Sequence, residues 1–387
     1  MLSLQNGKTG MKTRFGRFFP PDRASFALLC DTMYIYIEAK DCKGGMAVQG
    51  LFSAPGRILI GQGALEAFLR CARGGEGRLF FVLDQDLAVP AVLQSFLQEE
   101  GAPRFLVDGL SRAGYAAARD IAACRGAMER AGAARVVSIG GRAARDTAVL
   151  AAAGLERPVL YSAVPVRDFG AAAGWDAFRL GSAGEPDGSL AREQAPAFVP
   201  RTLVVDTGWE QPDGQWGWTG LSALARAVEA CRYRPHGLLA VGLARSAIGR
   251  IFEYLPLLAG NVQDRPESGL EAEAKEQVAT ASVEAGLAAA GLSGGYGRGG
   301  ASLELQYRLQ SGQGLVYAFA AGELQDGSVR PGGEKQALQA ALGRLIGGTG
   351  GMPDFVAAEV FRNAVQALYR RCGVPPFSQV PLRATDP

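Results

Sequence analysis

The stretch that decides the fold is Val137-Ser-Ile-Gly-Gly-Arg-Ala-Ala-Arg-Asp-Thr-Ala148. It lies across the end of a short apolar run, Arg135–Ile139, that is typical of a buried strand, and the start of a helical pattern over Ala144–Ala153. Gly140 and Gly141 separate the two. Glycines at a strand-to-helix turn let an anion approach the free N–H groups of the helix. The stretch therefore predicts a strand, a turn that suits a phosphate group, and a helix.

Strands and helices alternate on both sides of this stretch. The run Arg78–Asp84 is continuously apolar and ends on an acid, which is typical of a parallel strand buried on both faces. The other expected strands are Arg57–Ile60, Arg104–Val107, Arg135–Ile139 and Val159–Ser162, and the expected helices are Gly63–Ala72, Val89–Glu99, Tyr115–Ala131 and Ala144–Ala153. This alternation predicts right-handed crossovers, a parallel Rossmann-like sheet, and ligand binding at the carboxyl ends of the strands.

The pattern changes after Trp175. Gly181–Pro200 is rich in glycine, proline and aspartate, which predicts a hairpin or a loop, and Thr202–Asp206 predicts one more strand. Apolar residues then recur at helical spacing in Thr219–Cys231, Leu238–Leu258, Gly269–Ala290, Glu334–Ile346 and Phe355–Cys372. The 387 residues therefore divide into an α/β domain over residues 50–206 and an all-α domain over residues 207–387.

The first 46 residues differ from the rest of the chain in composition. Four of the six lysines lie there, whereas arginine is the main basic residue afterwards. The short apolar run Phe26–Cys30 does not make a signal peptide, because acids flank it. We expect residues 1–46 to be a disordered extension, or the product of a start assigned too early with Met46 as the true start.

Composition excludes several classes of protein. Hydrophobic residues make up 48% of the chain and charged residues 20%, which suits a soluble globular protein and not a disordered or fibrous one. The net charge of +2 gives no field that would attract nucleic acid or a membrane surface, and the apolar runs are too short to span a bilayer. Six scattered cysteines form no CxxC pair, which favours a reducing cytoplasm. The single histidine, His236, excludes a multi-histidine metal site within one chain.

Seven segments in order resemble the iron-containing alcohol dehydrogenases, and more distantly glycerol dehydrogenase and dehydroquinate synthase. The resemblance runs from about Pro55 to about Pro375, with Val137–Ala148 as the phosphate loop. The other six segments are Pro55–Leu65, Phe81–Asp84, Thr219–Ala230, Ile251–Pro256, Ala285–Ala288 and Arg370–Pro375. The resemblance implies the dehydroquinate synthase-like fold and an NAD(P)-linked oxidoreductase acting on a small alcohol, aldehyde or keto acid.

In those dehydrogenases one aspartate and three histidines hold the catalytic metal. The resemblance places these positions on Ser222, Arg226, Tyr296 and Gln313. None of the four is a carboxylate or an imidazole, the groups that a first-row divalent ion prefers, and Arg226 would repel a cation. We therefore expect no metal.

The expected cofactor site keeps part of its pattern. Gly140 and Gly141 remain, but the third glycine of the family falls on Arg142. Arg142 either adds a charged phosphate contact or fills the space that a dinucleotide needs, so NAD(P) binding stays open. Asp84, at a strand end on the adenosine side, is a candidate ribose acceptor. Asp146 either holds the turn into the helix or, as the resemblance implies, lies near the nicotinamide.

Two hypotheses of different classes follow. In the first, the protein is a metal-independent NAD(P)-linked oxidoreductase in which Arg226, Tyr296 or Gln313 stabilises the substrate oxygen, Arg226 as a fixed cation. In the second, it is a non-catalytic pseudoenzyme whose interdomain cleft binds a ligand or a partner, and Arg226 forms an ion pair between the lobes. Under both, we expect a small molecule in the cleft, no nucleic-acid or membrane partner, and a homodimer in the cytoplasm.

Overall fold

The three-dimensional structure is a computed structural model that describes residues 12–15, 33–40, 46–108, 114–181, 190–209, 215–233, 237–259, 268–290, 292, 296–307, 309–310, 312–324, 332–347 and 350–376. His236, the only histidine, lies outside the described residues. Tyr296 is described in its backbone alone. No helix in these ranges combines the length and the apolar character that crossing a bilayer requires.

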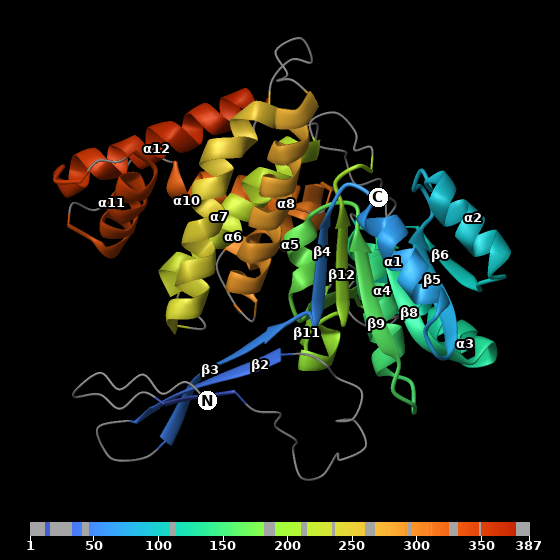
Figure 1. The fold of residues 1–387 in the computed structure, drawn as a ribbon. Coiled ribbons are helices and arrows are strands. Elements are labelled where there is room, and N and C mark those ends of the chain that lie inside the picture. Colours follow the sequence, from blue (N-terminus) through green and yellow to red (C-terminus); the bar gives the residue numbers. More distant parts are fainter. Residues whose placement is uncertain are drawn as a thin grey trace.

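Six parallel strands form the central sheet of the first lobe (Figure 1). They are β4 (Arg57–Gly61), β5 (Arg78–Asp84), β6 (Arg104–Val107), β8 (Ala133–Gly140), β9 (Leu160–Pro165) and β12 (Thr202–Asp206). Their spatial order is β4-β12-β9-β8-β5-β6, and each neighbouring pair runs parallel. The prediction of a parallel Rossmann-like sheet is confirmed.

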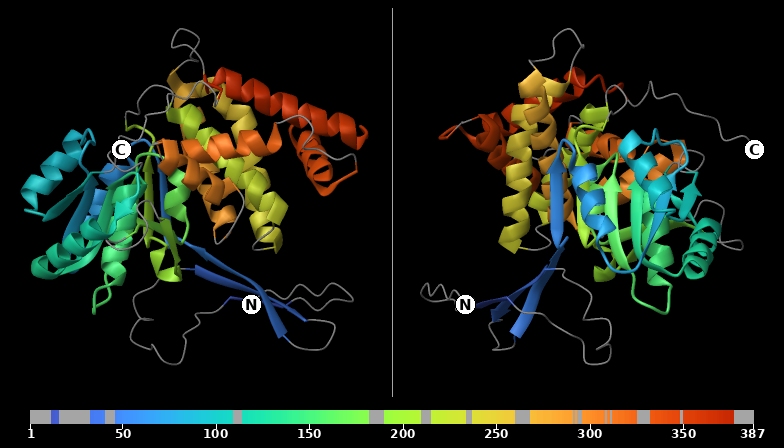
Figure 2. Two further views of the ribbon diagram at one scale, coloured as in Figure 1. Left: turned by 180° about the vertical axis from the view of Figure 1, so that it is seen from behind. Right: turned by 45° about the vertical axis from the view of Figure 1, so that its right-hand side comes forward.

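Helices cover both faces of this sheet, as the second view in Figure 2 shows. They are α1 (Ala64–Arg73) and α2 (Ala91–Glu99) on one face, and α3 (Ala118–Ala131) and α4 (Arg142–Ala153) on the other. Successive side chains of a strand point to opposite faces, so Phe80 and Val82 pack with α3 and α4 while Phe81 and Leu83 pack with α1 and α2. This double burial explains why β5 is apolar throughout.

Seven helices form the second lobe within the described ranges. They are α6 (Gln215–Tyr233), α7 (Gly237–Leu258), α8 (Ser268–Ala289), α9 (Tyr296–Tyr307), α10 (Gln313–Glu323), α11 (Glu334–Gly347) and α12 (Asp354–Arg371). The core lies between α6, α7 and α8, where Leu224, Ile248 and Val278 are fully buried. The predicted all-α second lobe is confirmed. The helices α9 and α10 were not predicted.

Two smaller sheets flank the central one. Strands β10 (Asp176–Leu180) and β11 (Leu190–Gln194) form an antiparallel hairpin in the region where a hairpin or loop was expected, and β7 (Ala116–Ala117) pairs with β10. The residues at the tip of this hairpin lie outside the described ranges.

The other small sheet lies in the amino-terminal part of the chain. It consists of β1 (Lys12–Phe15), β2 (Met33–Lys40) and β3 (Met46–Ala54), paired antiparallel. Two stretches of the expected disordered extension are therefore strands, because runs such as Met33-Tyr-Ile-Tyr-Ile37 combine aromatic and β-branched residues that favour strands. The end of β3 enters the core, where Phe52 and Ala54 are buried. A true start at Met46 stays a prediction.

The two lobes meet where the short helix α5 (Phe169–Ala173) lies on α8. A Cβ atom on Gly286 of α8 would lie 2.1 Å from the Gly170 carbonyl oxygen, so the two backbones touch. The Gly170 N–H also donates a hydrogen bond to Ser282 Oγ at 3.0 Å. This contact sets the spacing of the lobes around the site described next.

Candidate functional site

Asp168 lies at the centre of the boundary between the lobes. It follows β9 and lies at the N-cap position of α5, and its φ of 48° makes it the only non-glycine residue with a left-handed backbone among the described residues. Its side chain is 4% exposed. A strained backbone held in a buried position indicates that the surrounding contacts fix this residue in place.

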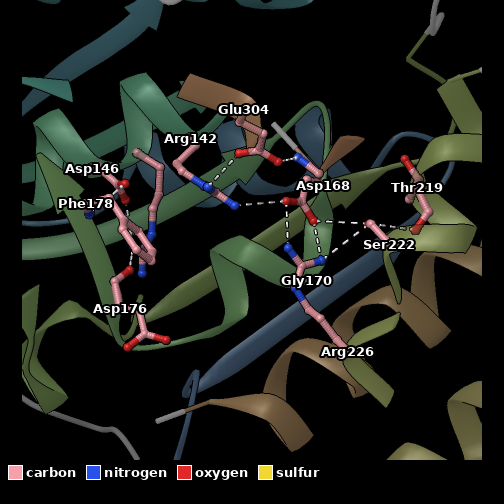
Figure 3. Close-up of polar contacts among 12 residues, drawn as sticks. Arg142, Asp146, Asp168, Gly170, Asp176, Phe178, Thr219, Ser222, Arg226 and Glu304 are labelled. Atoms are coloured by element: carbon pink, nitrogen blue, oxygen red, sulfur yellow. Dashed lines mark hydrogen bonds and ion pairs between the residues drawn. The ribbon is translucent and has the colours of Figure 1, made fainter. Parts of the chain in front are cut away.

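Arg226 reaches Asp168 from the opposite lobe. Its guanidinium makes a two-point contact, with Nη1 bound to Oδ1 and Nη2 2.7 Å from Oδ2 (Figure 3). Ser222 lies one turn earlier on α6, and its hydroxyl donates to Thr219 O at 3.0 Å and lies 3.5 Å from Asp168 Oδ1. Arg226 is 11% exposed, so the ion pair is largely shielded from water.

Arg142 forms the second half of the site. It is the first residue of α4, and its Nη1 lies 3.2 Å from Glu304 Oε2 and donates to the Tyr115 hydroxyl at 2.9 Å. Its Nη2 lies 3.5 Å from Asp168 Oδ2. The guanidinium also stacks over the rings of Tyr115 and Phe178, at 5.2 and 5.3 Å from their centroids. Arg142 therefore points away from the glycine turn and into the boundary between the lobes.

Glu304, on α9, is the carboxylate that Arg142 and Tyr115 contact. Its carboxyl is 1% exposed, accepts from the Tyr115 hydroxyl at 2.7 Å, and accepts from the Gly312 N–H at 2.7 Å. Burial raises the pKa of Glu304, and Arg142 opposes that rise. Burial also raises the pKa of Tyr115, so the phenol keeps its proton and acts as a donor. We call Arg142, Asp168, Arg226 and Glu304 the interlobe cluster.

The glycine turn holds a carboxylate of the protein itself. The Gly141 N–H donates to Asp84 Oδ2 at 2.5 Å, and a Cβ on Gly140 would lie 2.5 Å from the same oxygen. Burial raises the pKa of Asp84, while the bond from Gly141 and the charge of Arg167 lower it. Asp84 therefore occupies the place at the start of α4 where an external anion would bind.

Asp146 serves the structure of the first lobe. It is fully buried, its Oδ1 lies 2.7 Å from Arg145 Nη1, and its Oδ2 accepts from the Phe178 N–H at 3.0 Å. Arg145 in turn donates to the Gly174 carbonyl at 2.7 Å. Burial raises the pKa of Asp146, and Arg145 opposes the rise. The pair anchors β10 to α4.

Comparison with solved structures identifies the architecture. No family model matches the sequence, and no curated protein matches it. The iron-containing alcohol dehydrogenase from Corynebacterium glutamicum aligns over 82% of this chain and 84% of its own, with 16% identity and a TM-score of 0.62. The chain has the fold of the iron-containing alcohol dehydrogenases.

Two further structures support this. An archaeal halo-thermophilic alcohol dehydrogenase from a Red Sea brine pool aligns over 85% of this chain and 88% of its own, with 16% identity and a TM-score of 0.68. The sulfoacetaldehyde reductase from Bifidobacterium kashiwanohense, solved in complex with NAD+, aligns over 83% and 85%, with 19% identity and a TM-score of 0.63. At this level of identity the likeness concerns the fold alone.

The residues at the positions that the resemblance assigns to metal ligands do not have the chemistry of metal ligands. Ser222 Oγ and Arg226 Nη1 lie 3.4 Å apart, and the positive charge of Arg226 would repel a cation at this point. Gln313 begins α10, and its Oε1 accepts from the Gln310 N–H at 3.0 Å; none of the described contacts joins it to Arg226. Within the described ranges, no group of three or more His, Cys, Asp or Glu residues has a geometry that could hold a metal.

The glycine turn does not fit a dinucleotide in this conformation. The cavity beside it, lined in part by Gly140, Gly141, Arg142 and Arg167, measures about 10 Å³, which holds one water at most. The guanidinium groups of Arg142, Arg145, Arg167 and Arg226 face the carboxyl groups of Asp84, Asp146, Asp168 and Glu304. A pyrophosphate or a divalent cation would add uncompensated charge to this balanced set, which is costly in a buried site.

A larger cavity of about 330 Å³ opens on the other side of Asp84. Its lining combines apolar side chains with amides and one basic residue: Leu83, Asp84, Gln85, Val89, Gln94, Leu97, Gln98, Arg104 and Leu106. Asp84 Oδ1 is buried and has no hydrogen-bond partner in the described part of the chain. This cavity lies between α2 and the edge strand β6, beside the carboxyl end of β5, and ligands bind at the carboxyl ends of strands in such sheets.

Sequence reasoning missed three members of the site. Asp168 lies in the segment Pro165–Gly170 after β9, and nothing in the sequence shows that it faces two arginines. Glu304 lies on α9, a helix that was not predicted, and Tyr115 was expected only as a helix start. The available signal was an acid directly before Phe169-Gly170, which suits a helix cap.

Proposed function

We propose that the protein is a non-catalytic relative of the dehydrogenases that binds the nucleoside part of a ligand beside Asp84. The observation that supports this proposal is the interlobe cluster, in which Arg226 and Arg142 both pair with internal carboxylates. The resemblance assigns these two arginines to a metal-ligand position and to the third glycine position. Hydride transfer needs an open site between the lobes, and these ion pairs fill it.

The cavity beside Asp84 supports the binding part of the proposal. Its volume of about 330 Å³ lies at the lower end of the range for small-molecule sites. Asp84 lines the cavity, and its Oδ1 is buried without a hydrogen-bond partner in the described part of the chain. A small rotation of the carboxyl group would bring Oδ1 to the cavity, where a sugar hydroxyl is a suitable donor. Leu83, Val89 and Leu106 offer apolar surface to a base. The ligand class is therefore a nucleoside or a nucleotide whose sugar faces Asp84.

Calorimetry with adenosine, NAD+, NADH, NADP+ and NADPH tests this. We expect at least one nucleoside-containing compound to bind the wild type, and Asp84→Asn to weaken it about tenfold, because the amide cannot accept at both positions. Asp86→Asn, at an exposed acid two residues away, is the matched control and should bind like the wild type. Absence of binding by all five compounds would contradict the proposal.

A second candidate function is a metal-independent NAD(P)-linked oxidoreductase. It is favoured by solved structures of this fold that are dehydrogenases and reductases, one of them in complex with NAD+. It requires Arg142 and Asp84 to leave the positions described above. Arg226, Tyr296 and Gln313 would then stabilise the substrate oxygen. Oxidation of NADH by small aldehydes in the presence of a chelator, lost in Arg226→Met, would support this candidate and overturn the first.

The proposal also covers the cellular location and the oligomeric state of the protein. We propose a cytoplasmic location, based on the scattered cysteines of the sequence, and a homodimer. Fractionation of cells and analytical ultracentrifugation test these two points independently of any ligand.

A further inference from the structure

We propose that the interlobe cluster is a lock that holds the two lobes together, with Asp168 acting as an internal substitute for an anionic ligand. The proposal does not depend on nucleoside binding beside Asp84, because it rests on residues outside that cavity.

Each lobe contributes one arginine and one carboxylate to the interlobe cluster. The α/β lobe contributes Arg142 and Asp168, and the helical lobe contributes Arg226 and Glu304. Each cation pairs with a carboxylate of the other lobe, Arg142 with Glu304 at 3.2 Å and Arg226 with Asp168 at 2.7 Å (Figure 3). Separation of the lobes would break both pairs at once and expose four buried charges. This arrangement opposes opening in a way that pairs within one lobe cannot.

Asp168 binds to the arginines as a ligand carboxylate would. Both of its oxygens take part, since Arg226 makes a two-point contact and Arg142 Nη2 lies 3.5 Å from Oδ2. Planar two-point recognition of a carboxylate is the mode in which arginine binds anions most strongly. The unfavourable φ of 48° at Asp168 is maintained by these contacts. The side chain therefore satisfies a pair of arginines that would otherwise attract an external anion.

The lock also determines whether the interlobe cluster can take up an anion. Arg142 directly follows Gly141 in the sequence, and its side chain extends to Tyr115 and Glu304. The cavity left beside the turn is about 10 Å³, far below the volume of a pyrophosphate group. Loss of the Asp168 charge would leave Arg142 and Arg226 with one carboxylate fewer, so the cluster would then favour an anion.

The variant Asp168→Asn tests the lock, because asparagine tolerates a left-handed backbone and removes the charge alone. Hydrogen exchange should become at least about tenfold faster at Gly170 and Gly312, whose N–H groups bond to Ser282 and Glu304 across the boundary and within the cluster. Calorimetry with inorganic pyrophosphate at millimolar concentration should detect binding by the variant and none by the wild type.

Two further variants keep the test decisive. Glu323→Gln breaks the buried Arg232–Glu323 pair inside the helical lobe, and it should leave the exchange of Gly170 and the response to pyrophosphate unchanged. Arg226→Lys keeps the charge but loses the two-point contact, so it should accelerate exchange less than Asp168→Asn does. Unchanged exchange at Gly170 in Asp168→Asn, or wild-type binding of pyrophosphate as tight as that of the variant, would overturn the lock.

Discussion

At the scale of single residues, Asp168 shows how one carboxylate can determine a site. Its left-handed backbone costs roughly 1–2 kcal/mol in a non-glycine residue. The contacts to Arg226 and Arg142 offset that cost because charge-assisted hydrogen bonds are stronger in a shielded environment. The two contributions can be separated by substitution, since one depends on the charge and the other on the backbone.

Asp168→Asn should lower the free energy of unfolding by about 3 kcal/mol, because it leaves Arg226 and Arg142 with one carboxylate fewer. Asp168→Ala should lower it by about 1 kcal/mol more, because alanine is poorly suited to the left-handed region. Denaturation by urea measures both values. Equal losses in the two variants would show that the backbone at this position carries no strain.

Asp84 should make stability depend on pH. Burial raises its pKa above the ordinary value of 3.8, so the folded protein still binds a proton where the unfolded chain has lost it. The contribution of Asp84 to the free energy of unfolding therefore falls as the pH rises from about 3.8. Urea denaturation at several pH values, for wild type and Asp84→Asn, isolates this contribution. A contribution that grows with pH across this range would contradict the raised pKa.

At the scale of elements, glycines let two helices pack with their backbones in direct contact. Gly300 and Gly314 bring α9 against α10, since a Cβ on Gly314 would lie 2.1 Å from the Gly300 carbonyl oxygen. Helix α9 was not predicted from the sequence, and its glycines disfavour an isolated helix. Packing against α10 outweighs that preference, so α9 begins at Tyr296 and carries Glu304 into the site.

The contact between α5 and α8 should be sensitive to a single methyl group. Gly286→Ala would place a Cβ 2.1 Å from the Gly170 carbonyl oxygen, so we expect a loss of about 1–3 kcal/mol in the free energy of unfolding. Gly249→Ala is the matched control, because it also lies in a helix and has open space around it, and it should be neutral or stabilising by about 0.5–1 kcal/mol. Thermal denaturation compares the two. Similar effects of both would rule out a tight contact at Gly286.

At the scale of the whole molecule, the structure keeps the bilobed dehydrogenase fold and fills the boundary between the lobes with protein charges. The sheet, its covering helices and the helical lobe agree with solved dehydrogenases of this fold over more than four-fifths of the chain, since the alignments cover 82–85% of it. At the boundary between the lobes, arginines and carboxylates of the chain neutralise one another.

The purified protein should therefore contain no tightly bound iron or zinc. Arg226 places a positive charge at a position where the resemblance expects a metal ligand, and the neighbouring Ser222 offers no charged ligand. A chelator should shift the melting temperature by less than about 1 °C, because only a bound ligand contributes to stability by mass action. Elemental analysis and thermal denaturation measure this. One equivalent of either metal retained through dialysis against the chelator would contradict the prediction.

The sequence by itself determined the parallel sheet, the helical second lobe and the departure from the metal-ligand pattern at Ser222 and Arg226. Apolar periodicity and residue chemistry are local properties, and they can be read along the chain. Only the tertiary structure decided which charges meet. Arg226 and Asp168 are 58 residues apart, and Arg142 and Glu304 are 162 apart. Such pairings depend on how the two lobes pack, and no short-range pattern in the sequence encodes them.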